Sequence, residues 1–162
     1  MKILLIDPPW ILKNKNNLWK KVGSCLPSLG LAYLASVLEK EKHDVRYIDS
    51  TAERLAVDYF SKIVDEMKKE DYNPDFVGIT ATTALITNAY LIAEIIKKKF
   101  PDTKIIFGGV HASVLPDEAI NHSDYVIIGE GEETFAELLT NKDLSKIKGL
   151  VYKDDKGIHF NE

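Results

Sequence analysis

The chain has 162 residues, 45% of them hydrophobic, and its 25 acidic and 21 basic side chains give a formal net charge of -4. This size fits one domain with its own core. The charge excludes the overall basic field that favours binding to nucleic acid or anionic membranes. The single cysteine, Cys25, excludes an intrachain disulfide and an iron–sulfur cluster held by several cysteines of this chain.

Membrane and export signals are also missing from the sequence. No stretch approaches the roughly 18 consecutive apolar residues of a membrane span. The first apolar run, residues 3–6, ends at Asp7, far short of a signal-peptide core. We therefore expect a cytoplasmic protein with neither a nucleic-acid nor a membrane partner.

Short apolar runs rich in β-branched residues alternate with longer segments of helical period. The runs predict buried strands at 3–6, 45–48, 76–80, 104–107 and 125–128. The periodic segments predict helices over about 28–42, 52–69, 83–99 and 133–140, with a short helix after Pro116. Residues 150–153 and 158–160 flank Asp154-Asp155-Lys156-Gly157 and predict a hairpin.

Strands that alternate with helices indicate parallel crossover units. We expect an α/β fold with a doubly wound, five-stranded parallel sheet, flavodoxin-like or Rossmann-like, followed by a short C-terminal β-hairpin. The expected strand order is 2-1-3-4-5, because the first strand is apolar enough to be central.

Ligands of such sheets bind beyond the carboxyl ends of the strands, where the strand order switches. Four loops converge on this edge: residues 8–28, 80–83, 108–111 and 129–132. Their glycine pairs permit close approach of backbone to a bulky ligand, and their threonines offer hydroxyl groups without charge. We therefore expect a large polar ligand whose recognition does not depend mainly on phosphate.

Each feature also has a purely structural explanation. The glycines at 108–109 suit a tight turn, the threonines at 82–83 suit a helix N-cap, and Glu130 suits the first turn of a helix. His111 follows the glycine pair at the ligand edge, which distinguishes it from the other histidines.

Nucleotide-binding fingerprints do not occur in the chain. Asp7-Pro8-Pro9-Trp10 follows the first strand in place of G-x-G-x-x-G, and there is no G-x-x-x-x-G-K-[ST] loop. Gly129-Glu130-Gly131 begins like a dinucleotide motif, but Thr134 stands where the third glycine would fall. Cys25 has no adjacent base in sequence, which favours a packed thiol over a nucleophile.

Five motifs follow one another along nearly the whole chain. They are Pro27-Ser28-Leu29-Gly30-Leu31-Ala32-Tyr33-Leu34-Ala35; His43-Asp44-Val45 with Ile48-Asp49; Val77-Gly78-Ile79-Thr80 with Thr82; Phe107-Gly108-Gly109-Val110-His111-Ala112; and Gly129-Glu130-Gly131-Glu132. In this order they resemble the N-terminal cobalamin (B12)-binding domain of B12-dependent radical SAM enzymes.

The resemblance implies that cobalamin lies across the carboxyl edge of the sheet, with its nucleotide tail among the loops after the first, third and fourth strands. The cofactor-binding residues it implies are Ser28, Gly30, Thr80, Thr82, Thr83, Gly108, Gly109, His111, Gly129, Glu130 and Gly131. No residue is assigned as a metal ligand, although His111 is a candidate for proximity to cobalt. A Gly109→Leu change is expected to abolish cofactor uptake and leave a folded domain.

Two departures from related patterns limit what the resemblance implies. Methionine-synthase-like domains carry D-x-H-x-x-G after the first strand, where the histidine binds cobalt, but this loop contains no histidine. Radical SAM enzymes hold their cluster with C-x-x-x-C-x-x-C, which Cys25 alone cannot provide. We therefore expect the chain itself to be noncatalytic.

The implied organisation is a cobalamin-binding domain over residues 1–145 and a hairpin and linker over residues 146–162. The linker leads toward a missing radical SAM domain in cis, which holds a 4Fe-4S cluster and S-adenosylmethionine in a methyltransferase-like parent. The alternatives are a signalling or interaction domain on the same fold, and a small nucleotide- or flavin-binding protein. Thr80-Ala81-Thr82 stands where a receiver domain carries its phosphorylatable aspartate, which disfavours the signalling alternative.

Overall fold

The computed structural model describes residues 1–10 and 27–162, so most of the predicted 8–28 loop, with Cys25, lies outside the described residues. Seven strands of this described part form one sheet in the order β2-β1-β3-β4-β5-β6-β7. The parallel strands are β1 (Lys2–Asp7), β2 (Asp44–Asp49), β3 (Phe76–Thr80), β4 (Lys104–Gly108) and β5 (Tyr125–Ile127). The antiparallel strands are β6 (Leu150–Asp154) and β7 (Gly157–Phe160).

The expected order 2-1-3-4-5 is confirmed for the parallel strands, but the expected total of five strands is wrong. The C-terminal hairpin does not stand apart from the sheet, because β6 pairs with β5 and extends it. Leu150 and Val151 are fully buried although neighbouring residues of a strand point to opposite faces. Both faces of β6 are therefore covered by the domain. The role of residues 146–162 as a link toward a further domain stays a prediction.

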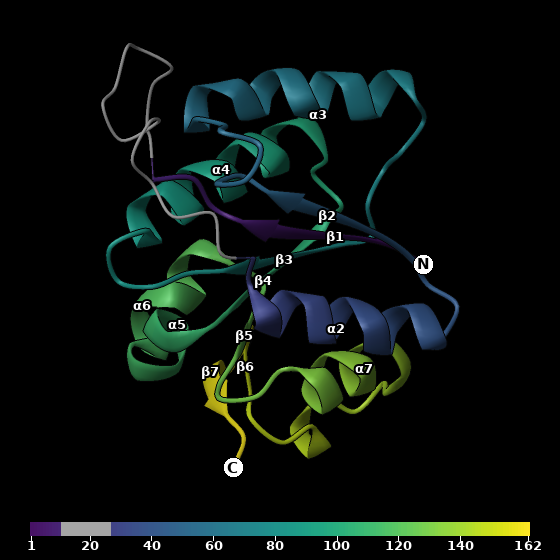
Figure 1. Ribbon diagram of the computed structural model, residues 1–162. Coiled ribbons are helices and arrows are strands. Elements are labelled where there is room, and N and C mark those ends of the chain that lie inside the picture. Colours follow the sequence, from purple (N-terminus) through teal and green to yellow (C-terminus); the bar gives the residue numbers. More distant parts are fainter. Residues whose placement is uncertain (11–26) are drawn as a thin grey trace.

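Helices cover both faces of the sheet (Figure 1). On one face lie α2 (Leu29–Lys40) and α7 (Glu132–Thr140). On the other lie α3 (Phe60–Lys69), α4 (Ile86–Lys99), α5 (Val110–Val114) and α6 (Pro116–Ala119). No helix among the described residues combines the length and apolar character needed to cross a membrane.

The first strand shows how the sequence builds two core layers. Ile3 and Leu5 belong to the layer beneath α2 and α7, whereas Leu4 and Ile6 belong to the layer beneath α3 and α4. All four side chains are buried, as expected for a central strand of a parallel sheet. Strand period and burial together therefore fix β1 between the two helical layers.

Two helix boundaries differ from those predicted. The helix expected over 52–69 begins at Phe60, because Asp49 Oδ1 accepts the backbone N–H groups of Thr51 (3.1 Å) and Ala52 (2.8 Å) and favours a turn there. The helix expected from residue 83 begins at Ile86. The sequence also gave no indication of α5, which begins directly after Gly109.

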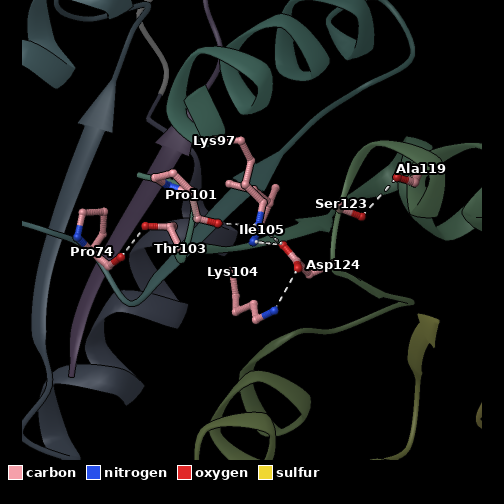
Figure 2. Close-up of polar contacts among 9 residues, drawn as sticks. All are labelled: Pro74, Lys97, Pro101, Thr103, Lys104, Ile105, Ala119, Ser123 and Asp124. Atoms are coloured by element: carbon pink, nitrogen blue, oxygen red, sulfur yellow. Dashed lines mark hydrogen bonds and ion pairs between the residues drawn. The ribbon is translucent and has the colours of Figure 1, made fainter. Parts of the chain in front are cut away.

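Asp124 joins the amino-terminal ends of the central strands (Figure 2). It lies just before β5 and accepts the backbone N–H of Ile105 in β4 at 2.9 Å. Lys97 Nζ at 3.0 Å and Lys104 Nζ at 3.2 Å neutralise the same carboxylate. Burial by itself raises the pKa of Asp124, but these three donors outweigh it and hold that pKa below its usual range.

Asp7 occupies the opposite, carboxyl edge, where β1 and β2 end side by side. The strand register pairs it with Asp49. Burial, and then the neighbouring Asp49 carboxylate, raise the pKa of Asp7 to about 6. Folding therefore favours the protonated form of Asp7 and is opposed by its ionisation.

We predict that Asp124→Asn lowers the free energy of unfolding at pH 7 by about 1 kcal/mol, because the amide keeps the shape but loses both ion pairs. The pKa of Asp124 is lowered in the folded state, so ionised Asp124 stabilises the wild-type fold, and this contribution is lost as pH falls through that pKa. The variant has no carboxylate at this position, so its free energy of unfolding should fall less than that of the wild type between pH 7 and pH 3. Urea unfolding at pH 7 and pH 3 measures both effects. The exposed Asp65–Lys99 pair provides the control: an Asp65→Asn loss as large as that of Asp124→Asn would contradict the prediction.

We also predict that the free energy of unfolding of Asp7→Asn depends less on pH than that of the wild type between about pH 4 and pH 7. Protonated Asp7 is favoured in the folded state, where its pKa is about 6, over the unfolded state, where it is 3.8. The resulting stabilisation is complete below pH 3.8 and is lost as pH rises through about 6. Wild-type stability should therefore fall more steeply than that of the variant across this range in urea titrations. Asp155→Asn in the exposed β6–β7 turn is the control. Equal slopes for wild type and Asp7→Asn would refute the assignment.

Candidate cofactor-binding site

A glycine stands in the middle of a row of large residues across the sheet. On the face covered by α2 and α7, the strand register aligns Tyr47, Leu5, Gly78, Ile106 and Tyr125. Its other four members are large, whereas Gly78 has no side chain. The Phe135 ring of α7 closes over this point, because a Cβ on Gly78 would lie 3.1 Å from Phe135 Cε1. The Leu5 and Phe135 side chains therefore pack directly on the Gly78 backbone, and the cavity lies beside them toward the carboxyl edge.

The cavity that Gly78 helps to line has a volume of about 430 Å³, a size typical of small-molecule sites. Its inner walls are buried and apolar, from α2, from the sheet and from α7: Leu31, Leu34, Ile106, Ile127 and Phe135. Its mouth lies at the carboxyl edge, where strand ends, helix starts and the loops between them meet: Gly30, Thr80, Gly108, Gly109, Ser113, Gly129, Glu130, Gly131 and Glu132. Val110 and Val114 border the mouth and are about 70% exposed. The site therefore combines an apolar interior with a polar, glycine-rich entrance.

Gly109 holds the loops after β3 and β4 against each other. Its φ of 87° is unfavourable for other residues, and a Cβ would lie 2.5 Å from Thr80 Oγ1. The backbone N–H of Ala81 donates to Gly108 O at 3.3 Å, and that of His111 donates to Ala81 O at 3.2 Å. A side chain at Gly109 strains this junction, so Gly109→Leu would disturb the loops as well as the cavity, and the expectation that the variant stays folded remains a prediction.

Gly108 has the opposite surroundings, with no atom within 4 Å of a Cβ position. It lines the cavity mouth and has no positive φ. A side chain at this position can be added without a clash at Cβ. Gly108 is therefore the better place to test whether the cavity holds a ligand.

Ser113 in α5 connects the start of that helix to the loop after β5. Its hydroxyl group donates to Gly109 O at 2.9 Å and accepts the backbone N–H of Gly129 at 3.0 Å. Sequence reasoning missed Ser113. Ser113 lies one helical turn after Gly109, and this spacing could have indicated its role. The helix that carries it, α5, was not predicted from the sequence.

Seven of the predicted site residues line the cavity: Gly30, Thr80, Gly108, Gly109, Gly129, Glu130 and Gly131. Ser28 is the N-cap of α2, where its Oγ accepts the backbone N–H of Leu31 at 3.5 Å. Thr82 and Thr83 are exposed and lie outside the lining. The roles of these three residues in cofactor binding stay predictions.

His111 also lies outside the cavity lining. It is 3% exposed, with Nδ1 3.2 Å from Thr83 Oγ1 and Nε2 3.6 Å from Glu118 Oε1 of α6. The described residues contain no group of three or more His, Cys, Asp or Glu side chains suited to a metal ion. Proximity of His111 to cobalt stays a prediction.

The apolar residues of the inner wall were not among the predicted site residues. They were assigned to the core because their runs and periodicity are those of ordinary strands and helices. Gly78 was the detectable exception, since a glycine inside a strand often marks close approach of a ligand or of other backbone.

The family model for the B12 binding domain matches residues 18–139. Among curated proteins, the chain is 41% identical over 162 residues to the uncharacterized methyltransferase PH0819 of Pyrococcus horikoshii, covering 96% of this chain and 33% of that protein. It is 28% identical over 177 residues to the cytidylyl-2-hydroxyethylphosphonate methyltransferase of Streptomyces wedmorensis, covering 96% and 32%. The chain thus spans about a third of the length of these relatives.

A solved structure shares the fold. The N-terminal domain of the hypothetical protein TM0182 from Thermotoga maritima matches with a TM-score of 0.50 and 20% identity, covering 73% of this chain and 89% of that one. At this identity the likeness concerns the fold alone. The resemblance to cobalamin-binding domains, inferred from the motifs, is confirmed by the family match. The chain therefore belongs to the B12 binding domain family.

Proposed function

We propose that this chain is the cobalamin-binding module of a larger methyltransferase-like enzyme. The observation that carries the proposal is the cavity itself, which has an apolar interior and a mouth built from glycine-rich loops at the carboxyl edge of the sheet. In a member of the B12 binding domain family, this is the place where the fold leaves room for a cofactor.

The mouth fits a wide, flat ring such as the corrin. Gly30 in the first turn of α2, Gly108 at the end of β4 and Gly129 in the loop after β5 all line the mouth, and no atom lies within 4 Å of a Cβ position at any of them. The corrin would rest on this open glycine rim. The nucleotide tail would enter the cavity between α2 and the sheet, with Thr80 and Ser113 offering hydroxyl groups at the entrance.

When bound, cobalamin supplies a cobalt centre that can accept and donate a methyl group. The residues of this chain would bind and orient the cofactor and exclude water from its tail. The reaction itself would need a further domain in cis, which we propose to be a radical SAM domain with a 4Fe-4S cluster and S-adenosylmethionine. The methyltransferase names of the relatives, and their threefold greater length, support this division of labour.

We predict that the purified chain binds hydroxocobalamin with a saturable change in its visible spectrum. Binding to the native state alone should also raise the thermal midpoint as the cofactor concentration increases. Spectral titration and thermal unfolding measure the two effects on the same sample. A folded chain that shows neither effect at about 1,000 µM cofactor, where even weak binding is saturable, would refute the proposal.

A second prediction concerns the mouth. Gly108→Leu should weaken hydroxocobalamin binding at least about tenfold, because the new side chain enters the cavity while its Cβ meets no atom. The thermal midpoint without cofactor should change little. Ser61→Leu, at an exposed position of α3 on the opposite face, is the matched control and should bind like wild type. Unchanged affinity of a folded Gly108→Leu protein would place the cofactor elsewhere.

A further inference from the structure

The strand β7 forms a free edge of the sheet. It is last in the strand order and, in the described part of the chain, pairs only with β6, beside the C-terminus (Figure 1). Two contacts on one face attach it to β6. The His159 ring stacks on that of Tyr152, with the ring centroids 4.8 Å apart, and His159 Nε2 lies 2.7 Å from Asp154 Oδ1. The edge is therefore a strand held in a defined position.

Backbone groups of two residues in β7 point away from the sheet. In an antiparallel pair, alternate residues direct both N–H and C=O toward the neighbouring strand, and the residues between them direct both outward. The N–H of Asn161 donates to Leu150 O at 3.0 Å, so residues 157 and 159 also face β6. Ile158 and Phe160 therefore present their N–H and C=O groups to the free edge, where a further strand can pair.

The side chains of this edge lack the charges that usually prevent such pairing. The strand at the opposite edge, β2, carries Asp44, Arg46 and Asp49. By contrast, β7 contains no Asp, Glu, Lys or Arg. On the face opposite His159, Ile158 is 39% exposed and Phe160 is 48% exposed. This edge is thus apolar, exposed and open to another strand.

The residues that flank β7 indicate which strand fits. Lys156 and Glu162 lie on either side of it, each three residues from His159. If a second copy of β7 pairs antiparallel about His159, Lys156 comes opposite Glu162 of the second copy. Ile158 comes opposite Phe160 of the second copy, and twofold symmetry repeats both pairs. The same register joins the outward backbone groups of Ile158 to those of Phe160, so hydrogen bonding, apolar contact and charge all favour it.

We propose that the chain forms a twofold dimer by antiparallel pairing of β7 with β7 of a second copy, so that one sheet extends across both copies. The strand has only four residues, and the contact is smaller than the roughly 1,200 Å² of stable complexes. We therefore expect a weak, reversible dimer with a Kd of about 100 µM. No residue of β7 lines the cavity in the part of the chain that the structure describes, so the dimer does not depend on the proposed function.

Sedimentation equilibrium of the purified chain, at concentrations from about 10 to about 1,000 µM, tests the association. We expect the mass to rise from that of a monomer toward that of a dimer and to stop there, because the twofold contact uses the β7 edge of both copies and closes the assembly. A monomer at every concentration would overturn the proposal. Growth beyond the dimer would also overturn it.

An exchange of charges tests the register. Lys156→Glu and Glu162→Lys, made singly, place like charges opposite each other and should each weaken the dimer at least about threefold. The double variant restores opposite charges and should regain the wild-type Kd. Both positions are exposed, so the thermal midpoint should change little. Single variants that dimerise like wild type, or a double variant that stays weak, would overturn the proposed pairing.

A second pair of variants tests the apolar edge. Ile158→Lys places a charge in the middle of the contact and should abolish the dimer over the same concentrations. Leu29→Lys makes the same change at a position of α2 that is 70% exposed, and should dimerise like wild type. Circular dichroism and the thermal midpoint check that both variants are folded. A folded Ile158→Lys protein that still dimerises would place the contact elsewhere and overturn the proposal. If Ile158→Lys does not fold, the charge exchange decides the proposal.

Discussion

The site depends on the close packing of Leu5 and Phe135 on the backbone of Gly78, which a side chain at this position would disturb. Gly78 stands between Leu5 and Ile106 in a row that is otherwise filled by large residues. Protein interiors pack to nearly crystalline density, so a hollow of about 430 Å³ has to be held open by its surroundings. Here the two central strands on either side of β3 and the helices α2 and α7 provide that frame.

The loops around the hollow are held by backbone contacts more than by side chains. Gly109 permits the close junction between the loops after β3 and β4, and the Ser113 hydroxyl connects this junction to Gly129. Such a rim keeps its shape without bulky groups and leaves the opening free. The arrangement suits the binding of a large cofactor.

Much of the fold could be predicted from sequence, because the buried strands are continuous apolar runs and their alternation with helices limits the topology. The strand order followed from the apolar character of residues 3–6. The pairing of the hairpin with the main sheet could not be predicted. A hairpin signal describes local pairing and carries no information on whether the first strand of the hairpin pairs with Tyr125–Ile127. The short helix after Gly109 was missed because five residues are too few to show helical period.

For the site, the sequence by itself determined which loops meet at the carboxyl edge, since parallel strands all end there, and its motifs identified the family. Only the tertiary structure decided which residues face the cavity. His111 and Gly108 are three residues apart, yet His111 is buried beside Thr83 and Glu118 and Gly108 lines the mouth. Likewise, Leu34 and Phe135 look like ordinary core residues in sequence. They become cavity walls only because the fold brings α2, α7 and the sheet together, a relation between distant segments that no local pattern encodes.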